Sequence, residues 1–154
     1  AAFRRLHSAR PAEPTSPSGK IHMTDYNEYF DEVIQAHLVI ERWFAVEQDS
    51  AEMERLLSRF SADFSMVTPL GRALDIEALR ALFHAAGGKK PGFRIELSEL
   101  RGIALHAHGA TLSYREQQSD ASGLRTDRRS TVVFEKTEAG RVLWRHLQET
   151  FCAE

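Results

Sequence analysis

The first half of the chain has apolar residues spaced as in helices, and the second half has them spaced as in strands. Between residues 26 and 48, apolar positions recur at three- and four-residue steps around most of the circumference, which predicts a long, largely covered helix. Two shorter segments with the same period follow Asp49 and Asp75. Each aspartate stands where an N-cap residue would, and Gly87 and Gly88 follow the last segment. The pattern therefore predicts three helices before residue 88.

One short strand interrupts these helices. Residues 63–67 alternate in polarity and are followed by Thr68-Pro69, where proline removes a ladder donor and ends the strand. After Pro91 the period changes to two, in segments such as FRIELSEL and RVLWRHLQETF that are separated by glycine-bearing turns. Helices followed by four antiparallel strands predict an α+β fold, in which the helices pack on one face of a curved sheet.

The composition limits the possible functions without naming one. The chain has 154 residues, of which 42% are hydrophobic and 27% charged, as expected of one globular domain with its own core. A net charge of −2 gives no electrostatic reason to bind nucleic acid or an anionic membrane, so we expect neither partner. Cys152 is the single cysteine, which excludes an intrachain disulfide, and no apolar stretch reaches membrane-spanning length. We therefore expect a cytoplasmic protein.

The first 22 residues differ from the rest of the chain. They hold three of the five prolines and have no periodic apolar face. We interpret residues 1–22 as a flexible leader and residues 23–154 as a single domain. Met23 offers a native start, and Ile-His-Met resembles a cloning junction, so the leader is either native or introduced by cloning.

The order of elements, together with FSADFSMVTPLG, DIEALRALF and GRVLWRHLQETF, resembles the nuclear-transport-factor-2-like (NTF2-like) superfamily, which includes ketosteroid isomerases and SnoaL-type cyclases. The resemblance covers residues 25–151. It implies a cone-shaped half-barrel, in which three N-terminal helices pack on a strongly curved mixed or antiparallel sheet and leave a pocket at one end. It also implies a homodimer through the outer face of the sheet, where we expect Leu143, Leu147 and Phe151 to need cover.

The isomerases of this superfamily use two aspartates, and neither has a counterpart in this chain. Their general base lies on the early strand directly before a proline, and Thr68 occupies the matching position. Their second aspartate is a protonated oxyanion donor on the penultimate strand, where this chain has Ser130, Thr131 and Val132. A threonine hydroxyl is not a general base near pH 7, so we expect no isomerisation of the aspartate-dependent kind.

Alternation along the last strand places Trp144, His146 and Gln148 on one face, which the resemblance directs into the pocket. If the chain is an enzyme, we assign the catalytic roles to His146 as base or acid, Glu116 as its orienting carboxylate and Tyr114 as a donor. The predicted ligand-binding residues are Trp43, Met66, Thr68, Ser130, Trp144 and Gln148.

The other titratable residues have less specific interpretations. His146 is also typical of a hydrogen-bonded core residue, and Glu116 could instead pair with Arg128 or Arg129 across the strands. We interpret His37 as a core or rim residue. His106 and His108 lack a third ligand, so no metal ion is expected, and no motif calls for a cofactor.

Two classes of function remain open. The first is a pocket protein that binds a small hydrophobic molecule with a carbonyl or hydroxyl group. Such a protein could also be a cofactor-free enzyme for proton transfer, dehydration, cyclisation or hydrolysis. The second class is a non-catalytic dimeric module that binds a ligand or a partner protein. A deep cavity would favour the first class, and an exposed apolar patch on the outer sheet would favour the second.

Removal of residues 1–22 should leave the fold intact, because the leader lacks a periodic apolar face and little burial should be lost with it. The melting temperature, measured by calorimetry on the full and shortened chains, should agree within about 5 °C. A larger fall, equivalent to roughly 1–2 kcal/mol for a domain of this size, would show that the leader packs on the domain.

Overall fold

The computed structural model describes residues 4–5, 21–46 and 48–153. Most of the predicted leader, residues 1–3 and 6–20, lies outside them. Along the chain the elements are β1 (Arg4–Arg5), the 3₁₀ helix η1 (Met23–Tyr26), α1 (Asn27–Ala45), α2 (Ser50–Leu57), β2 (Phe60–Val67), β3 (Ala73–Asp75), α3 (Ile76–Ala86), β4 (Arg94–His106), β5 (Gly109–Ser119), β6 (Arg125–Lys136) and β7 (Val142–Phe151).

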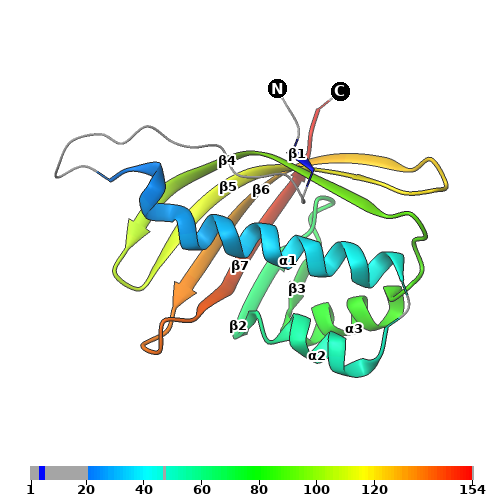
Figure 1. Ribbon diagram of the computed structural model, residues 1–154, viewed down its shortest axis with the longest axis horizontal. Helices are drawn as coiled ribbons and strands as arrows, with labels where there is room; N and C mark the ends of the chain where they lie inside the picture. Colours follow the sequence, from blue (N-terminus) through cyan, green and yellow to red (C-terminus); the bar gives the residue numbers. More distant parts are fainter. Residues whose placement is uncertain (1–3, 6–20, 47, 154) are drawn as a thin grey trace.

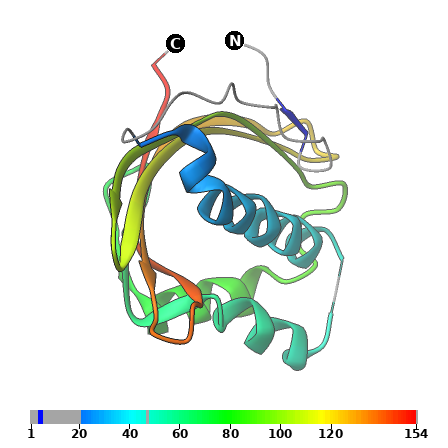
Figure 2. The same ribbon diagram turned by 60° about the vertical axis from the view of Figure 1, so that its left-hand side comes forward.

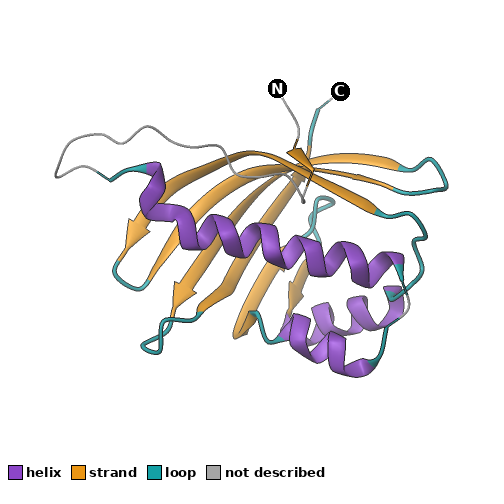
Figure 3. Cartoon of the chain, in the orientation of Figure 1, coloured by secondary structure: helices purple, strands orange, loops and turns teal. Residues whose placement is uncertain are grey.

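The strands form one mixed sheet in the order β1-β4-β5-β6-β7-β2-β3. Strand β2 runs parallel to β7, whereas the other paired strands are antiparallel. Figure 2 shows the sheet arching around α1, and Figure 1 shows α2 and α3 together beyond the C-terminal half of that helix. All helices lie on the concave side of the sheet (Figure 3). The prediction of an α+β cone with three α-helices on a curved mixed sheet is confirmed.

Local capping chemistry sets the starts of α2 and α3, as the sequence predicts. The Asp49 carboxylate accepts from the Glu52 amide at 3.1 Å, and the Asp75 carboxylate accepts from the Ala78 amide at 2.8 Å. Each bond satisfies one of the amides that a helix N-terminus leaves without a partner. Strand β3 is not predicted from sequence, because three residues are too few to show alternation. It pairs with the end of β2 after the turn at Pro69.

The core lies between α1 and the inner face of β4 to β7. Along β5 and β6, inward side chains alternate with more exposed ones, and the buried set includes Leu112, Tyr114, Val132 and Phe134. On α1 the buried side chains occupy several turns and include Tyr29, Phe30, Val33 and Ala36. Because α1 is apolar around so much of its surface, only a sheet that curves around it can cover it.

A β-bulge in β7 changes which side chains face the interior. Trp144 pairs with Phe134, but the next register partner, Val133, pairs with His146, so two residues of β7 oppose one residue of β6. An extra residue reverses the facing of every later position. Leu147 consequently lies on the inner side with Trp144. The prediction that His146 and Gln148 share the face of Trp144 is wrong, because it assumed unbroken alternation.

The same bulge corrects the face expected to form a dimer. Leu147 lines the interior, and Phe151 lies on the side of Arg128, whose guanidinium carbon is 5.2 Å from the centre of the Phe151 ring. Of the three apolar residues expected on the outer face of β7, only Leu143 precedes the bulge and stays there. The homodimer stays a prediction, with less apolar surface on β7 to support it.

Strand β4 crosses the start of the helical segment at Gly102, where a side chain would not fit. A Cβ atom on Gly102 would lie 2.3 Å from the ring of Tyr26, which is buried. Gly102→Ala should therefore destabilise the fold by about 1–3 kcal/mol, the usual cost of overpacking. Urea unfolding would measure this loss. In a Tyr26→Leu background the same change should cost much less, and equal costs in the two backgrounds would contradict the proposed clash.

Candidate functional site

A cavity of about 230 Å³ lies between α1, α3, the β2–β3 turn and the inner faces of β5 to β7. Most of its wall is apolar and includes phenylalanines from three elements, namely Phe44 of α1, Phe60 and Phe64 of β2 and Phe83 of α3. Its charged lining residues are His37, Lys90, Glu116, Arg128 and Glu149. An apolar cavity with a few convergent polar groups is the usual form of a small-molecule site.

His37 and Glu116 form an ion pair inside the cone. The His37 Nδ1 donates to the Val33 carbonyl at 2.6 Å, and its Nε2 lies 3.0 Å from a Glu116 carboxylate oxygen. With a carbonyl on one side and a carboxylate on the other, both ring nitrogens act as donors, which is the protonated form of histidine. The second Glu116 oxygen accepts from the Gln118 amide at 2.6 Å. The pair links α1 to β5.

The electrostatics of this pair agree with its geometry. Burial lowers the pKa of His37, but the charge and hydrogen bond of Glu116 outweigh burial, so the pKa of His37 is raised. Burial raises the pKa of Glu116, yet His37, Arg128 and Gln118 together lower that pKa to about 2. Both groups are consequently held charged near neutral pH.

Glu149 is a second buried carboxylate, and it has weaker partners. The Ser130 hydroxyl is 3.4 Å from one of its oxygens, and the nearest Arg128 nitrogen is 3.5 Å away. Burial and the charge of Glu116 raise the pKa of Glu149 to about 7, against the opposing effect of Arg128 and His37. Two carboxylates in one site thus titrate far apart, and Glu149 is the one that exchanges a proton near neutral pH.

One buried polar atom of this cluster, the Arg128 Nε, has no hydrogen-bond partner among the described residues, and the Tyr114 hydroxyl lies beside the Ser130 hydroxyl. Burial, followed by the charges of Glu116 and Glu149, raises the pKa of Tyr114 well above its ordinary value, so its hydroxyl keeps its proton. The ring of Tyr114 lies edge-on to His37 with centroids 5.4 Å apart. Native proteins rarely bury unsatisfied donors, so the orphaned Arg128 Nε calls for a specific explanation.

The structure places some of the predicted site residues at this cavity. Met66, Thr68 and Trp144 line it, and Glu116 lies at its charged end. Ser130 and Tyr114 are buried on the same sheet face beside the charged cluster. The Thr68 hydroxyl accepts from the Arg72 amide at 3.1 Å. That bond stabilises the turn at Pro69.

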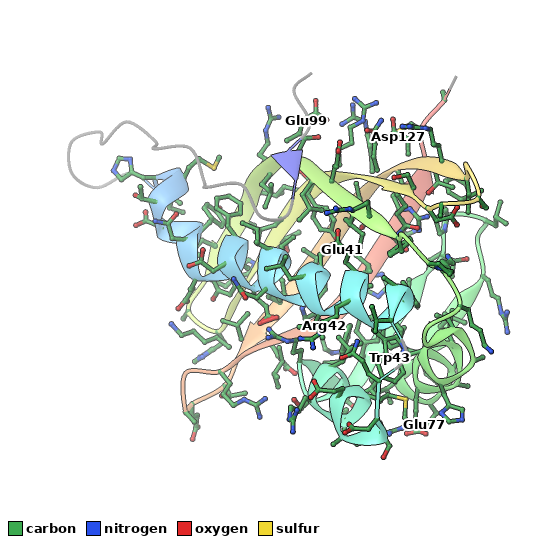
Figure 4. The ribbon with its side chains drawn as sticks, turned by 45° about the vertical axis from the view of Figure 1, so that its right-hand side comes forward. Glu41, Arg42, Trp43, Glu77, Glu99 and Asp127 are labelled. Atoms are coloured by element: carbon green, nitrogen blue, oxygen red, sulfur yellow. The ribbon has the colours of Figure 1, made fainter. Side chains whose placement is uncertain are left out.

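Tyr114 and Ser130 lie beside the cavity without lining it, and three further predicted residues lie elsewhere. His146 lies on the outer face of the sheet, where its Nδ1 is 2.7 Å from the Ser65 hydroxyl, and Gln148 is exposed. The Trp43 indole donates to the Phe83 carbonyl at 2.7 Å and abuts Gly87, so it joins α1 to the end of α3 (Figure 4). Glu116 therefore orients His37 and not His146.

Three of the charged residues that matter here were not predicted from the sequence. His37 was expected to be a core or rim residue, and Arg128 was expected only as an alternative partner of Glu116. Arg128 is the cross-strand neighbour of Glu116, yet its closest carboxylate contact is with Glu149. Glu149 was missed because its facing depends on the bulge. For His37, the available signal was its position four residues after Val33 on the buried face of α1.

Within ranges 4–5, 21–46 and 48–153, no three His, Cys, Asp or Glu side chains are grouped so as to hold a metal ion. None of the helices in this part of the chain combines the length and apolar character needed to span a bilayer.

Solved structures show which family this cone represents. The chain is 49% identical to an NTF2-like protein of unknown function from Pseudomonas aeruginosa, with 81% of this chain and 98% of that chain covered and a TM-score of 0.77. It also resembles an NTF2-like protein from Rhodospirillum rubrum (14% identity, 84% and 99% covered, TM-score 0.63). A third match is a ketosteroid isomerase-like protein from Erwinia carotovora atroseptica (11% identity, 86% and 100% covered, TM-score 0.61).

No protein-family model and no curated protein sequence matches the chain. The first solved structure nevertheless combines high identity with nearly full coverage. The chain belongs to the NTF2-like family. The two more distant structures support the fold alone.

Glu149→Gln should change how stability depends on pH. The pKa of Glu149 is about 7 in the folded protein, above its ordinary value of 4.5. The folded protein thus keeps a proton that the unfolded chain loses, and the stability that depends on this proton decreases as pH rises from about 4.5 to about 7. Glutamine does not titrate, so the variant should not lose this stability as pH rises. Between about pH 4.5 and 8, the variant should gain on the order of 2–3 kcal/mol relative to wild type, at about 1.4 kcal/mol per pKa unit.

Urea unfolding at several pH values would measure this difference. Glu138→Gln, in the exposed turn before β7, is the matched control and should follow wild type. A variant curve parallel to wild type would mean that Glu149 titrates normally in the folded protein.

Proposed function

We propose that the cavity binds a small hydrophobic molecule with one polar end. The observation that carries this proposal is the division of the cavity into a wall of aromatic and aliphatic side chains and one end formed by His37, Glu116, Arg128 and Glu149. Burying charges is costly, and a core needs no such group for packing. A ligand whose polar end contacts these charged side chains would account for their burial.

If the ligand undergoes chemistry, the most suitable acid–base group is Glu149. Glu116 is a weak base with its pKa of about 2, and both nitrogens of His37 are engaged. The pKa of Glu149 is about 7, and Glu149 lines the cavity. It therefore meets the requirement that a general acid or base titrate near the working pH. The reaction would be a cofactor-free proton transfer, or a dehydration, cyclisation or hydrolysis that depends on one.

The alternative, a non-catalytic interaction module, has less support. The outer face of the sheet, which such a module would use, carries ion pairs, with Arg115 2.5 Å from Asp127 and Arg129 2.9 Å from Glu99. A polar surface of this kind does not require a protein partner. A homodimer through the outer face would be compatible with the ligand-binding proposal.

Neutral amides with a phenyl group, from 2-phenylacetamide to 4-phenylbutanamide, provide a direct test of binding. At least one should bind with a dissociation constant below about 1 mM in titration calorimetry. Leu147→Phe should weaken that binding at least about tenfold, because the larger side chain takes up space in a cavity that Leu147 lines.

Leu143→Phe is the matched control, because Leu143 precedes the bulge and faces away from the cavity. It should bind the amides as wild type does. If no amide binds, or if both phenylalanine variants bind as wild type, the proposed function is wrong.

A further inference from the structure

We propose that the polar end of the ligand is a carboxylate, held by Arg128 at the charged end of the cavity. This inference rests on the proposed function and specifies the chemical class of the ligand. It follows from the charges that line the cavity, from the unused hydrogen-bonding capacity of Arg128 and from the position of Glu149 beside it.

Cationic residues outnumber carboxylates in the cavity. Three basic residues line it, His37, Lys90 and Arg128, against two acids, Glu116 and Glu149. Glu116 is already neutralised by His37 at 3.0 Å. When Glu149 is protonated, Arg128 is left as an excess positive charge, which one ligand carboxylate would balance and a cationic ligand would increase.

The charge of Lys90 has other partners. Its ammonium nitrogen is 5.2 Å from the ring centres of both Phe44 and Phe93, so its charge lies against aromatic faces. Asp120, which does not line the cavity, also interacts with Lys90 electrostatically. Lys90 therefore contributes less of the excess than Arg128, and we assign the direct contact to Arg128.

The N–H donors of the Arg128 guanidinium are only partly used by neighbouring residues. One terminal nitrogen donates to the Thr126 hydroxyl at 3.2 Å, and the other lies 3.5 Å from Glu149. The Nε is buried and has no acceptor among the described residues. Phe151 supports the guanidinium from one side, at 5.2 Å. A guanidinium presents a planar fork of donors that matches the two oxygens of a carboxylate.

A ligand carboxylate beside Glu149 requires that Glu149 be protonated. Glu149 faces Glu116 from β5, Arg128 and Ser130 from β6, and His37 from α1. A second negative charge next to these two carboxylates would be repelled unless Glu149 takes up a proton, after which its hydroxyl can donate to the ligand. Since the pKa of Glu149 is about 7, binding of the acid should weaken as pH rises above neutrality.

The test compares 3-phenylpropanoate with its uncharged amide, 3-phenylpropanamide, by titration calorimetry. At pH 6.5 the acid should bind at least about tenfold more tightly than the amide, as expected for a hydrogen bond to a charged group. From pH 6.5 to 8.5 the affinity for the acid should fall roughly twentyfold as Glu149 loses its proton, while the affinity for the amide changes less than about twofold.

Two substitutions assign these effects to residues. Arg128→Gln should weaken binding of the acid at least about tenfold and binding of the amide less than about threefold. Arg129→Gln, on the next residue of β6 and exposed on the outer face, is the matched control and should change neither. Glu149→Gln should keep the preference for the acid and remove most of the pH dependence of acid binding. A pH dependence caused by loss of charge on His37 would persist in this variant. Thermal melts would confirm that each variant is folded.

The possible failures can be told apart. If the amide binds as tightly as the acid, or if Arg128→Gln in a folded protein weakens both equally, the carboxylate inference is wrong and the ligand-binding cavity stands. A pH dependence that persists in Glu149→Gln would also overturn the role given to Glu149. If neither compound binds, the carboxylate inference is wrong, and the proposed function is wrong as well if no other amide of the phenyl series binds.

Discussion

The structure depends on the burial of one long helix. Helix α1 is apolar around most of its circumference, so packing on a flat sheet would leave much of that surface in water. The sheet instead curves around the helix, as Figure 2 shows, and α2 and α3 cover the remaining side of its C-terminal half. A helix and a curved sheet cannot meet at every point, and the space between them at the α3 end is the cavity.

The ion pair between His37 and Glu116 places charge inside this apolar packing. Its two members come from α1 and β5, and both are buried. Because His37 neutralises Glu116, the negative charge of Glu116 stays in place and acts on Glu149. One carboxylate is thereby kept ionised, and the other is brought to the pH range where proton exchange is useful. The fold therefore gives two carboxyl groups of the same kind very different pKa values.

The bulge in β7 decides which residues take part. With unbroken alternation, His146 and Gln148 would face the cavity and Leu147 and Glu149 would face outward. The extra residue after Trp144 reverses this, so an imidazole is placed against Ser65 on the outside and a carboxylate is placed beside Arg128 on the inside. A one-residue irregularity of the backbone thus replaces one candidate acid–base group with another.

The sequence by itself determined the three helices, their caps at Asp49 and Asp75, the four long strands and the α+β class, because periodicity and capping are local properties. The cone was implied by the resemblance to the NTF2-like superfamily. It also identified Glu116, Met66, Thr68 and Trp144 as residues of the interior. Only the tertiary structure decided that His37 pairs with Glu116, 79 positions away in the sequence, and that Glu149 faces inward. The first depends on how the helix lies in the cone, and the second depends on the bulge where β7 pairs with β6.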